Sequence, residues 1–301
     1  MRALARDDVA ARTVSHHGAI PVIGDLFDAD ALAEGMGGTD VVYHVAGVNE
    51  MCSGDRRAMD RVNVDGSLEV IRAAARTGVG RVVYTSSAVV IGERQGVVGT
   101  EQTVHSGEYV SPYARSKHLA ELGVTAEAVR LGVDLVIVNP SSVQGPGRAT
   151  GSAQLLLHVL NSRRPLLVES TLSIIDIEDC TNGHINAAEF GVPGERYILS
   201  GATFSVVEAV ELLADGAGRQ ITPRWVSRSL VRRLGIPAAR IAFVVKPSLD
   251  VCPELIRTLL HGHRFDGSKA AADLRLTYTE VSDTIARTVR WFREEGLIRD
   301  N

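Results

Sequence analysis

Two serines, a tyrosine and a lysine stand at spacings that suit proton transfer to and from a substrate oxygen. The run "TSSA" (85–88) ends an apolar stretch, and 26 residues after Ser87 comes "YARSK", from Tyr113 to Lys117. A tyrosine and a lysine four residues apart lie on one face of a helix, one turn from each other. A tyrosine hydroxyl, with a pKa of about 10, is a poor base near neutral pH, and a nearby lysine cation would lower that pKa. A serine hydroxyl at the facing strand end would then hydrogen-bond the substrate oxygen.

The YxxxK spacing is specific enough to support this interpretation. With six Tyr and three Lys in 301 residues, such a pair arises by chance with a probability of about 0.06. The three lysines are Lys117, Lys246 and Lys269 in a chain with 32 basic residues, which indicates that this position needs lysine itself. The competing interpretation is an exposed tyrosine that stacks on a lysine stem.

The hydrophobic pattern alternates between strand-like and helix-like segments. Short apolar runs typical of strands buried on both faces occupy residues 19–25, 40–47, 81–92 and 133–143. Stretches with capping residues predict helices at 28–36, 59–78 and 111–132. This alternation predicts an α/β fold with a Rossmann-type, doubly wound parallel sheet. Helical patterns dominate the later part of the chain, which predicts a smaller α-rich C-terminal part.

Composition excludes several classes of function. The formal net charge of −4 does not favour nucleic acid or an anionic membrane as a partner. Cys52, Cys180 and Cys252 lie far apart, so their spacing predicts neither a disulfide framework nor a CxxC metal site. No apolar run reaches the roughly 18 residues of a membrane span. We expect a cytoplasmic protein that acts on a small molecule, with a homodimer as an option for its assembly.

At these motifs the chain resembles the extended short-chain dehydrogenase/reductases. The similar branch is the NAD(P)-dependent epimerase/dehydratase group, with its dihydroflavonol reductase-like and hopanoid-associated sugar epimerase-like members. Besides "YTSSAVVIG" and "SPYARSK", the matching segments are "GDLFDADAL" (24–32), "VYHVAG" (42–47), "VNVDGS" (62–67), "VNPSSVQGPG" (138–147), "IDIEDCTNGH" (175–184) and "FDGSKAAADL" (265–274).

The resemblance implies a role for each site residue. Tyr113 is the acid/base, Lys117 its pKa partner and ribose contact, and Ser87 orients the substrate oxygen, with Ser86 as the rival. The implied cofactor is NAD(P), and further cofactor-binding residues are Asp25, Leu26, Val45, Ala46, Gly47, Pro140 and Ser142. Residues 1–165 would form a truncated NAD(P)-binding Rossmann domain. Residues 166–301 would form mostly the substrate-binding part, interleaved with the end of the sheet.

The chain departs from the family pattern at its beginning. Family members start with a strand and a GxxGxxG-like turn, which are missing here, so we expect the first strand of the sheet to be missing. Gly92, Gly96 and Gly99 are interpreted as a flexible connection rather than a substitute for that turn. A misassigned start would explain the departure. It predicts that DNA directly upstream encodes about 20–30 further residues in frame, and that the 301-residue form expresses poorly and binds no dinucleotide.

The end of the first strand bears on the choice of cofactor. NAD enzymes usually carry an acidic residue at the end of the second strand of this fold, whereas an arginine there suits a 2′-phosphate. Here Arg6, with Arg2 behind it, comes before any acid. This favours NADP(H) over NAD(H), and the alternative is that Arg6 is a solvated surface arginine.

Other candidate chemistries have less support. His16–His17 and His261–His263 lack the companions of a zinc site, so all four are interpreted as exposed histidines, and no metal is expected. His44, in an apolar strand, is interpreted as a core histidine. The acidic residues of the segment 176–179 suit a helix N-terminus without a catalytic role. Neither GxSxG nor SxxK occurs, so serine hydrolysis is not supported.

The function expected from these residues is reversible hydride transfer at a carbon that bears an oxygen. The reaction would stop at alcohol/ketone interconversion, or use the transient ketone to epimerise or dehydrate its substrate. The substrate would be a sugar nucleotide or a steroid-like or flavonoid-like molecule. The rival hypothesis is a non-catalytic binding or regulatory protein that kept the fold and lost the cofactor.

Overall fold

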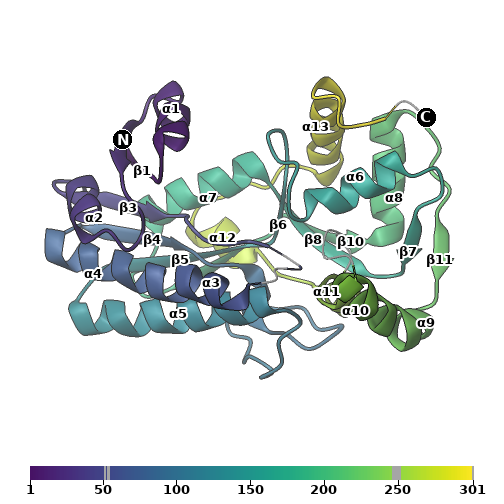
Figure 1. Cartoon of the computed structure of the whole chain (residues 1–301), viewed down its shortest axis with the longest axis horizontal. Coiled ribbons are helices and arrows are strands. Elements are labelled where there is room, and N and C mark those ends of the chain that lie inside the picture. The colour runs from purple at the N-terminus through teal and green to yellow at the C-terminus, as the bar shows by residue number, and fades with distance from the viewer. Residues whose placement is uncertain (51, 53–54, 246–251, 300–301) are drawn as a thin grey trace.

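A four-stranded parallel sheet lies at the centre of the N-terminal half, in the order β3-β4-β5-β9 (Figure 1). The computed structural model describes residues 1–50, 52, 55–245 and 252–299. The strands of this sheet are β3 (Val41–His44), β4 (Arg81–Thr85), β5 (Leu135–Pro140) and β9 (Arg196–Leu199). Val83 of β4 pairs with Val136 of β5, and Val138 pairs with Tyr197 of β9. β5 is buried along its whole length because strands flank it and helices cover both faces.

Helices cover both faces of this sheet. One face carries α2 (Ala29–Met36), α4 (Ser67–Thr77) and α5 (Pro112–Leu131), and the other carries α7 (Ile177–Phe190) and α12 (Ser268–Asp273). Val82 and Tyr84 of β4 contribute to the first core and Val83 to the second, as the two-residue period of a strand requires. The predicted α/β fold with a doubly wound parallel sheet is therefore confirmed.

The first two strands form a pair of their own. β1 (Arg2–Ala5) and β2 (Ile20–Ile23) are parallel and are connected by α1 (Asp8–His16). Within the part of the chain that the structure describes, no strand pairing joins this pair to β3. Ile20 and Ile23 remain exposed. The parallel strands of the N-terminal half are thus divided into two groups.

The C-terminal half is built on two small sheets. One contains β6 (Ser142–Gln144), β8 (Thr171–Asp176) and β10 (Ala202–Ser205), and the other contains β7 (Leu166–Val168) and β11 (Arg224–Val226). Against the larger one pack α6 (Ala153–Asn161), α8 (Val206–Ala217) and α13 (Val281–Glu294), around a core that includes Leu213 and Phe292. The chain returns to the central sheet through β9, so the two halves are interleaved.

Short helical segments complete the chain: α3 (Arg56–Asp60), η1 (Arg61–Gly66), η2 (Ala88–Ile91), α9 (Arg228–Leu230), η3 (Val231–Gly235), α10 (Ile236–Val245) and α11 (Pro253–His261). No helix within the described ranges is long and apolar enough to cross a membrane.

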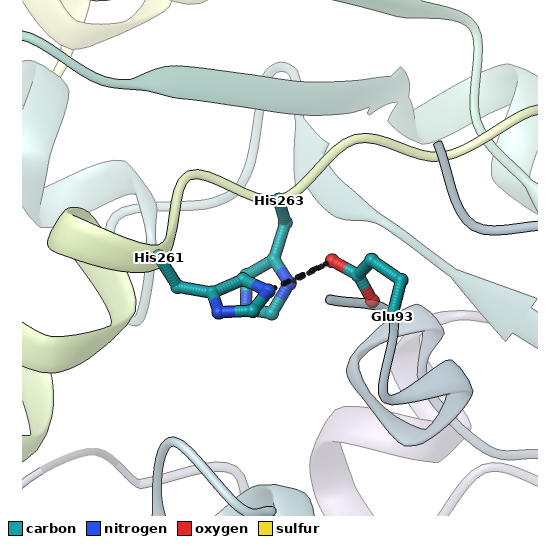
Figure 2. A group of neighbouring side chains, drawn as sticks. All are labelled: Glu93, His261 and His263. Carbon is teal, nitrogen blue, oxygen red and sulfur yellow. Dashed lines mark hydrogen bonds and ion pairs between the residues drawn. The ribbon is translucent and has the colours of Figure 1, made fainter. Parts of the chain in front are cut away.

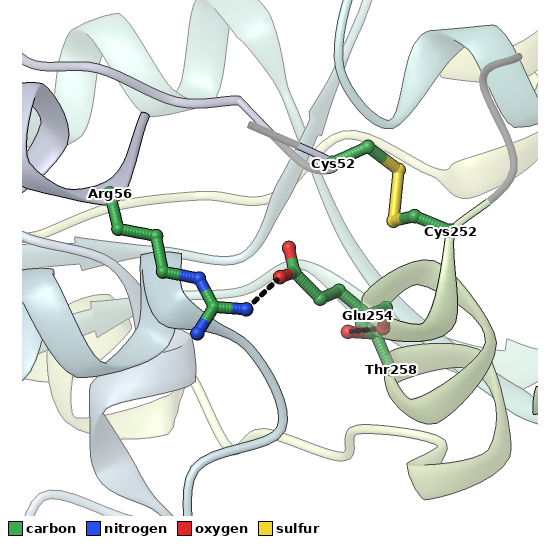
Figure 3. Close-up of a disulfide and its surroundings, with 5 residues drawn as sticks. All are labelled: Cys52, Arg56, Cys252, Glu254 and Thr258. Atoms are coloured by element: carbon green, nitrogen blue, oxygen red, sulfur yellow. Dashed lines mark hydrogen bonds and ion pairs between the residues drawn. A yellow bond between two sulfur atoms is a disulfide. The ribbon is translucent and has the colours of Figure 1, made fainter. Parts of the chain in front are cut away.

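A disulfide joins Cys52 to Cys252 (Figure 3). The wide spacing of the cysteines predicts no such bond, and that prediction is wrong because the fold brings Cα atoms 200 residues apart to 5.5 Å. The bond ties the segment that follows β3 to the beginning of α11. Next to it, Arg56 forms an ion pair with Glu254 at 3.2 Å. Cys180 is free and buried.

Candidate active site

The N-terminal turn of α5 carries the predicted tyrosine. The helix begins at Ser111, whose hydroxyl accepts a hydrogen bond from the backbone N–H of Ala114 at 3.1 Å. It ends at Gly132, which has a φ of 70° and closes the last turn in the left-handed conformation. These caps confirm the helix expected at 111–132 and place Tyr113 in its first turn.

Ser87, which follows the end of β4, lies close enough to Tyr113 for its side chain to lower the pKa of the tyrosine by hydrogen bonding. The carboxyl end of the sheet therefore lies beside the start of α5. Burial raises the pKa of Tyr113 above 10, while the bond to Ser87 and the positive charge of Arg148 act in the opposite direction. The sequence predicts that Lys117 lowers the pKa of Tyr113. In the structure the pKa is raised instead, because burial outweighs the effects that lower it.

Ser86, the rival for the role of Ser87, lies next to it in a different environment. Its backbone N–H donates to the carbonyl of Val138 at 2.8 Å. Its hydroxyl is buried and has no hydrogen-bond partner among the described residues. Of the two serines, Ser87 is the one whose side chain lowers the pKa of Tyr113.

Lys117 lies one turn after Tyr113 and is 5% exposed. Its Nζ donates to the carbonyl oxygen of Thr85 at 2.7 Å and to the hydroxyl of Tyr84 at 3.3 Å. Burial lowers the pKa of Lys117 to about 8, and the charge of Glu121 acts in the opposite direction. The ammonium is therefore held at the end of β4.

A buried polar cluster behind these residues was not predicted. Nδ2 of Asn139 donates to Oε2 of Glu121 at 2.7 Å and to the carbonyl of Ser87 at 3.3 Å. Arg196 of β9 donates to Oε1 of the same glutamate at 3.2 Å. One signal was available in the sequence: Glu121 follows Lys117 by four residues and so lies on the same face of α5. Arg148, which favours the ionised form of Tyr113, carried no comparable signal.

Gly47 lies where the ribose contact was expected. A Cβ at Gly47 would lie 3.1 Å from Oδ1 of Asn63 and 3.8 Å from Nζ of Lys117, so the glycine keeps open the space beside the lysine. Asn63 fixes this segment, since its side chain accepts from the N–H of Val48 at 2.7 Å and donates to its carbonyl at 3.0 Å. Val45, Ala46 and Gly47 are exposed.

The other predicted cofactor residues lie at strand ends. Asp25 is exposed after β2, where its carboxylate accepts from the N–H of Phe27 at 2.7 Å. Leu26 is half-buried beside Gly66. Pro140 is buried at the end of β5, and the hydroxyl of Ser142 accepts from Nε2 of Gln144 at 2.8 Å.

Arg2, in β1, and Arg6, directly after this strand, differ in their contacts. Arg2 donates to the carbonyl oxygens of Gly37 at 2.7 Å and Glu34 at 3.1 Å, at the C-terminus of α2. Arg6 is exposed. Arg2 therefore has a structural role, and Arg6 is the one whose side chain is accessible to a ligand.

Gly92, Gly96 and Gly99 connect η2 to the segment before α5. Gly92 and Gly96 have φ values of 63° and 82°, and Gly99 donates through its N–H to the carbonyl of Arg264 at 2.8 Å. No helix begins directly after them in the described chain. They form a connection, as predicted.

Two structural interpretations are confirmed. His44 is 3% exposed, its Nε2 lies 2.9 Å from the hydroxyl of Ser67, and burial lowers its pKa to about 3. At the start of α7, Asp176 accepts from the N–H of Glu178 at 2.8 Å, and Asp179 accepts from the N–H of Thr279 at 2.7 Å. The acidic residues thus cap the helix and fasten a neighbouring segment.

The interpretation of the histidine pairs is correct for one and wrong for the other. His16 and His17 are exposed, as predicted. The side chains of His261 and His263 are only 17% and 13% exposed, because both face the buried Glu93. Glu93 is the acidic companion that the sequence did not reveal, since it lies 170 positions before His263.

Comparison with known proteins adds to this geometry. The profile of the 3-beta hydroxysteroid dehydrogenase/isomerase family matches residues 4–188. Sterol demethylase protein B of Methylococcus capsulatus is 30% identical over 282 residues, which cover 91% of this chain and 85% of that protein. A 3 beta-hydroxysteroid dehydrogenase/Delta 5→4-isomerase of Mycobacterium tuberculosis is 28% identical and covers 83% of this chain and 72% of its own.

Solved structures with the same fold cover nearly the whole chain. The crystal structure of gox2253 has a TM-score of 0.84 at 28% identity and covers 99% of this chain and 92% of its own. DesIV, a dTDP-glucose 4,6-dehydratase from Streptomyces venezuelae solved with NAD and TYD bound, has a TM-score of 0.74 at 24% identity. It covers 96% of this chain and 84% of its own.

Proposed function

The chain belongs to the 3-beta hydroxysteroid dehydrogenase/isomerase family, and we propose from this premise that it interconverts a secondary alcohol and a ketone with a nicotinamide dinucleotide. The predicted resemblance to NAD(P)-dependent epimerases, dehydratases and reductases is confirmed at the level of the family, and with it the assignment as an enzyme of this class. The observation that carries the specific proposal is the position of Tyr113 one helical turn before Lys117, whose Nζ is held at the end of the strand that leads to Ser87.

These side chains support proton transfer at one substrate oxygen. In reduction, the hydroxyl of Tyr113 donates its proton to the carbonyl oxygen as that oxygen gains negative charge, and Ser87 holds the oxygen in place. In oxidation, the phenolate of Tyr113 accepts the proton of the substrate hydroxyl. The dinucleotide supplies or accepts the hydride when bound. Lys117 contributes a positive charge and a donor beside Gly47, where the ribose fits.

The raised pKa of Tyr113 bears on the direction of the reaction. Because burial favours the neutral phenol, the form that donates a proton is the one present near neutral pH. Reduction therefore starts from the resting state of the site, whereas oxidation requires the tyrosine to ionise first. At neutral pH the site is therefore in the protonation state that begins the reduction of a ketone or aldehyde.

For the cofactor we propose NADP(H) over NAD(H). The support is Arg6, which is exposed at the end of β1 and accessible to a 2′-phosphate. An Arg6→Ala variant should lose affinity for NADPH and keep its affinity for NADH. Equal affinities of parent and variant for both cofactors would remove this argument.

For the substrate we propose a small molecule: a sugar nucleotide, or a steroid-like or flavonoid-like compound. We further propose that the protein is cytoplasmic, and the assembly to test is a homodimer. The names of the relatives span sterols, steroids and nucleotide sugars. Disulfides are rare in the cytoplasm, and those found there are often redox-active. The Cys52–Cys252 bond therefore bears on the compartment in which the protein works.

The decisive experiment measures turnover of NADPH and NADH with one ketone from each substrate class, for the parent chain and for Tyr113→Phe. Turnover by the parent that the variant loses supports the proposal. Cofactor binding without turnover of any substrate would support the rival, a binding protein that kept the fold. Turnover that Tyr113→Phe retains would show that another group transfers the proton.

A further inference from the structure

Glu93, His261 and His263 form a compact group of metal-ligating side chains that the proposed hydride-transfer chemistry does not use (Figure 2). Glu93 comes just after η2, and the two histidines come from the last residue of α11 and the segment after it. Oε1 of Glu93 lies 2.7 Å from Nδ1 of His263 and 3.3 Å from Nε2 of His261. The donor atoms of all three residues lie within 4.8 Å of one another.

Two donor atoms of this group are buried without a partner. Oε2 of Glu93 and Nε2 of His263 have no hydrogen bond among the described residues, although both atoms are inaccessible. A buried polar atom without a partner is costly, by about 1–3 kcal/mol. Glu93 itself is only 2% exposed, and its carboxylate faces both imidazoles. The group therefore keeps unused donor atoms in a buried place.

We propose that Glu93, His261 and His263 bind a divalent metal ion such as Zn²⁺. Two imidazoles and one carboxylate are a ligand set that Zn²⁺ uses at sites with an open fourth position. Tetrahedral Zn²⁺ with bonds of about 2.0–2.1 Å places its ligand atoms roughly 3.3 Å apart. The distances of 2.7 and 3.3 Å from Glu93 to the two imidazole nitrogens lie just below and at that value, so small side-chain rotations suffice. The metal replaces the hydrogen bonds that Glu93 now accepts.

All three proposed ligands line a cavity of about 620 Å³. Ala114, the neighbour of Tyr113, lines the same cavity, so the site lies at the wall of the space next to the candidate active site. Arg232 and Arg257 also line it, and their charges oppose a cation. We therefore expect weaker binding than at a four-ligand structural site.

Metal binding would connect two segments that lie far apart along the chain. Glu93 follows the segment that carries Ser87, and His261 ends α11. A metal bound by both would fasten the wall of the cavity near the catalytic serine to the C-terminal half.

The experiment titrates the tag-free, metal-depleted full chain, disulfide intact, with Zn²⁺ by calorimetry and with Co²⁺ by visible absorption. The proposal expects one ion per chain and a Co²⁺ spectrum of a four-coordinate site. Replacing a ligand should weaken binding by about 100-fold or more, since loss of even an outer-shell partner costs 10–100-fold. The variants are Glu93→Gln, which keeps the shape of the side chain, and His261→Asn, the more exposed of the two histidines.

A matched control and a second readout keep the result unambiguous. The double variant His16→Asn/His17→Asn removes an exposed histidine pair and should leave the affinity unchanged. Zn²⁺ should raise the melting temperature of the parent and the control but not of the ligand variants. Absence of stoichiometric binding to the parent, unchanged affinity in both ligand variants, or loss of binding in the control alone would each overturn the proposal. If Glu93→Gln fails to fold, His261→Asn carries the comparison.

Discussion

The side-chain amide of Asn139 donates a hydrogen bond to the carboxylate of Glu121 across 2.7 Å in the interior of the protein. The same amide holds the carbonyl of Ser87, and the same carboxylate pairs with Arg196. Three elements, β5, α5 and β9, are thereby fixed relative to the strand end that carries Ser87. We expect the cluster to orient the proposed site.

Replacing Glu121 by leucine should destabilise the protein markedly. The change removes the carboxylate that the amide of Asn139 and the guanidinium of Arg196 share, which leaves them only the carbonyls of Ser87 and Glu101. A buried donor that loses its partner costs about 1–3 kcal/mol. Urea unfolding measures the loss, and Glu69→Gln is the matched control, because its pair with Arg72 is half-exposed and should contribute little. Equal stability of Glu121→Leu and the control would show that the buried cluster does not hold these elements together.

Replacing Tyr113 by phenylalanine should lower kcat by about 100-fold or more, the usual effect of removing a general acid. Cofactor affinity and the free energy of unfolding should stay close to those of the parent, because only the hydroxyl is removed. Steady-state kinetics and NADPH fluorescence titration give the two values. A variant that kept a tenth of the parent's rate would contradict the assignment.

Lys117 should not tolerate conservative replacement. Lys117→Ala and Lys117→Arg should both lower the rate and the cofactor affinity, because a planar guanidinium cannot fill the space of a compact ammonium between Thr85 and Gly47. Steady-state kinetics give kcat for the rate and KM for the cofactor as separate values. Full activity of Lys117→Arg would mean that charge alone matters at this position.

The stability of the protein should rise with pH between about 8 and 10.5 because of Lys117. Burial lowers its pKa from 10.5 to about 8 in the folded state, so in this range the unfolded chain binds more protons than the folded one. Below pH 8 the cost of the buried ammonium is fully present, and it is relieved as pH rises through the folded pKa. Urea unfolding at pH 7.5 and 9.5 should show a smaller pH dependence for Lys117→Met than for the parent. Parallel curves would refute the lowered pKa.

The rate of alcohol oxidation should rise with pH more steeply than the rate of ketone reduction. Oxidation needs the phenolate of Tyr113, whose pKa is raised by burial, whereas reduction needs the phenol. Initial rates in both directions over a range of pH, with saturating cofactor, provide the comparison. A shared pH profile would indicate that a different step limits both rates.

Breaking the Cys52–Cys252 bond should lower the free energy of unfolding by about 2–4 kcal/mol, the usual range for a disulfide that closes a long loop. The variant is Cys52→Ser, and the control is Cys180→Ser; burial raises the pKa of that free thiol to about 12, so it is inert towards thiol exchange. Thiol titration of the unfolded, non-reduced chain should find one free group. Three free groups would show that the bond is not formed.

The parts of the site that lie close together in the sequence could be predicted from it. Tyr113 and Lys117 share one helix, and the caps of that helix are local, so spacing and residue type were sufficient. The βαβ alternation likewise predicted a doubly wound parallel sheet. Contacts across long separations could not be predicted this way. Glu93 meets His263 where two distant segments come together, and an isolated bridge pairs Gly99 with Phe265 in the same segments.

The pKa of Tyr113 shows a second limit of reasoning from spacing. A lysine one turn away predicts a lowered value, but whether the tyrosine is buried depends on packing that no local pattern reveals. The cysteines illustrate the same point, since their spacing of 200 residues says nothing about their distance in the fold.

The disulfide also makes the chain a covalent ring from residue 52 to residue 252, with two free tails. A single peptide-bond cleavage within that ring leaves every residue attached to every other. A protease that nicks the connection between η2 and α5 would therefore release no fragment until a reductant is added. On a denaturing gel, the nicked protein would migrate as one species without reductant and as two with it.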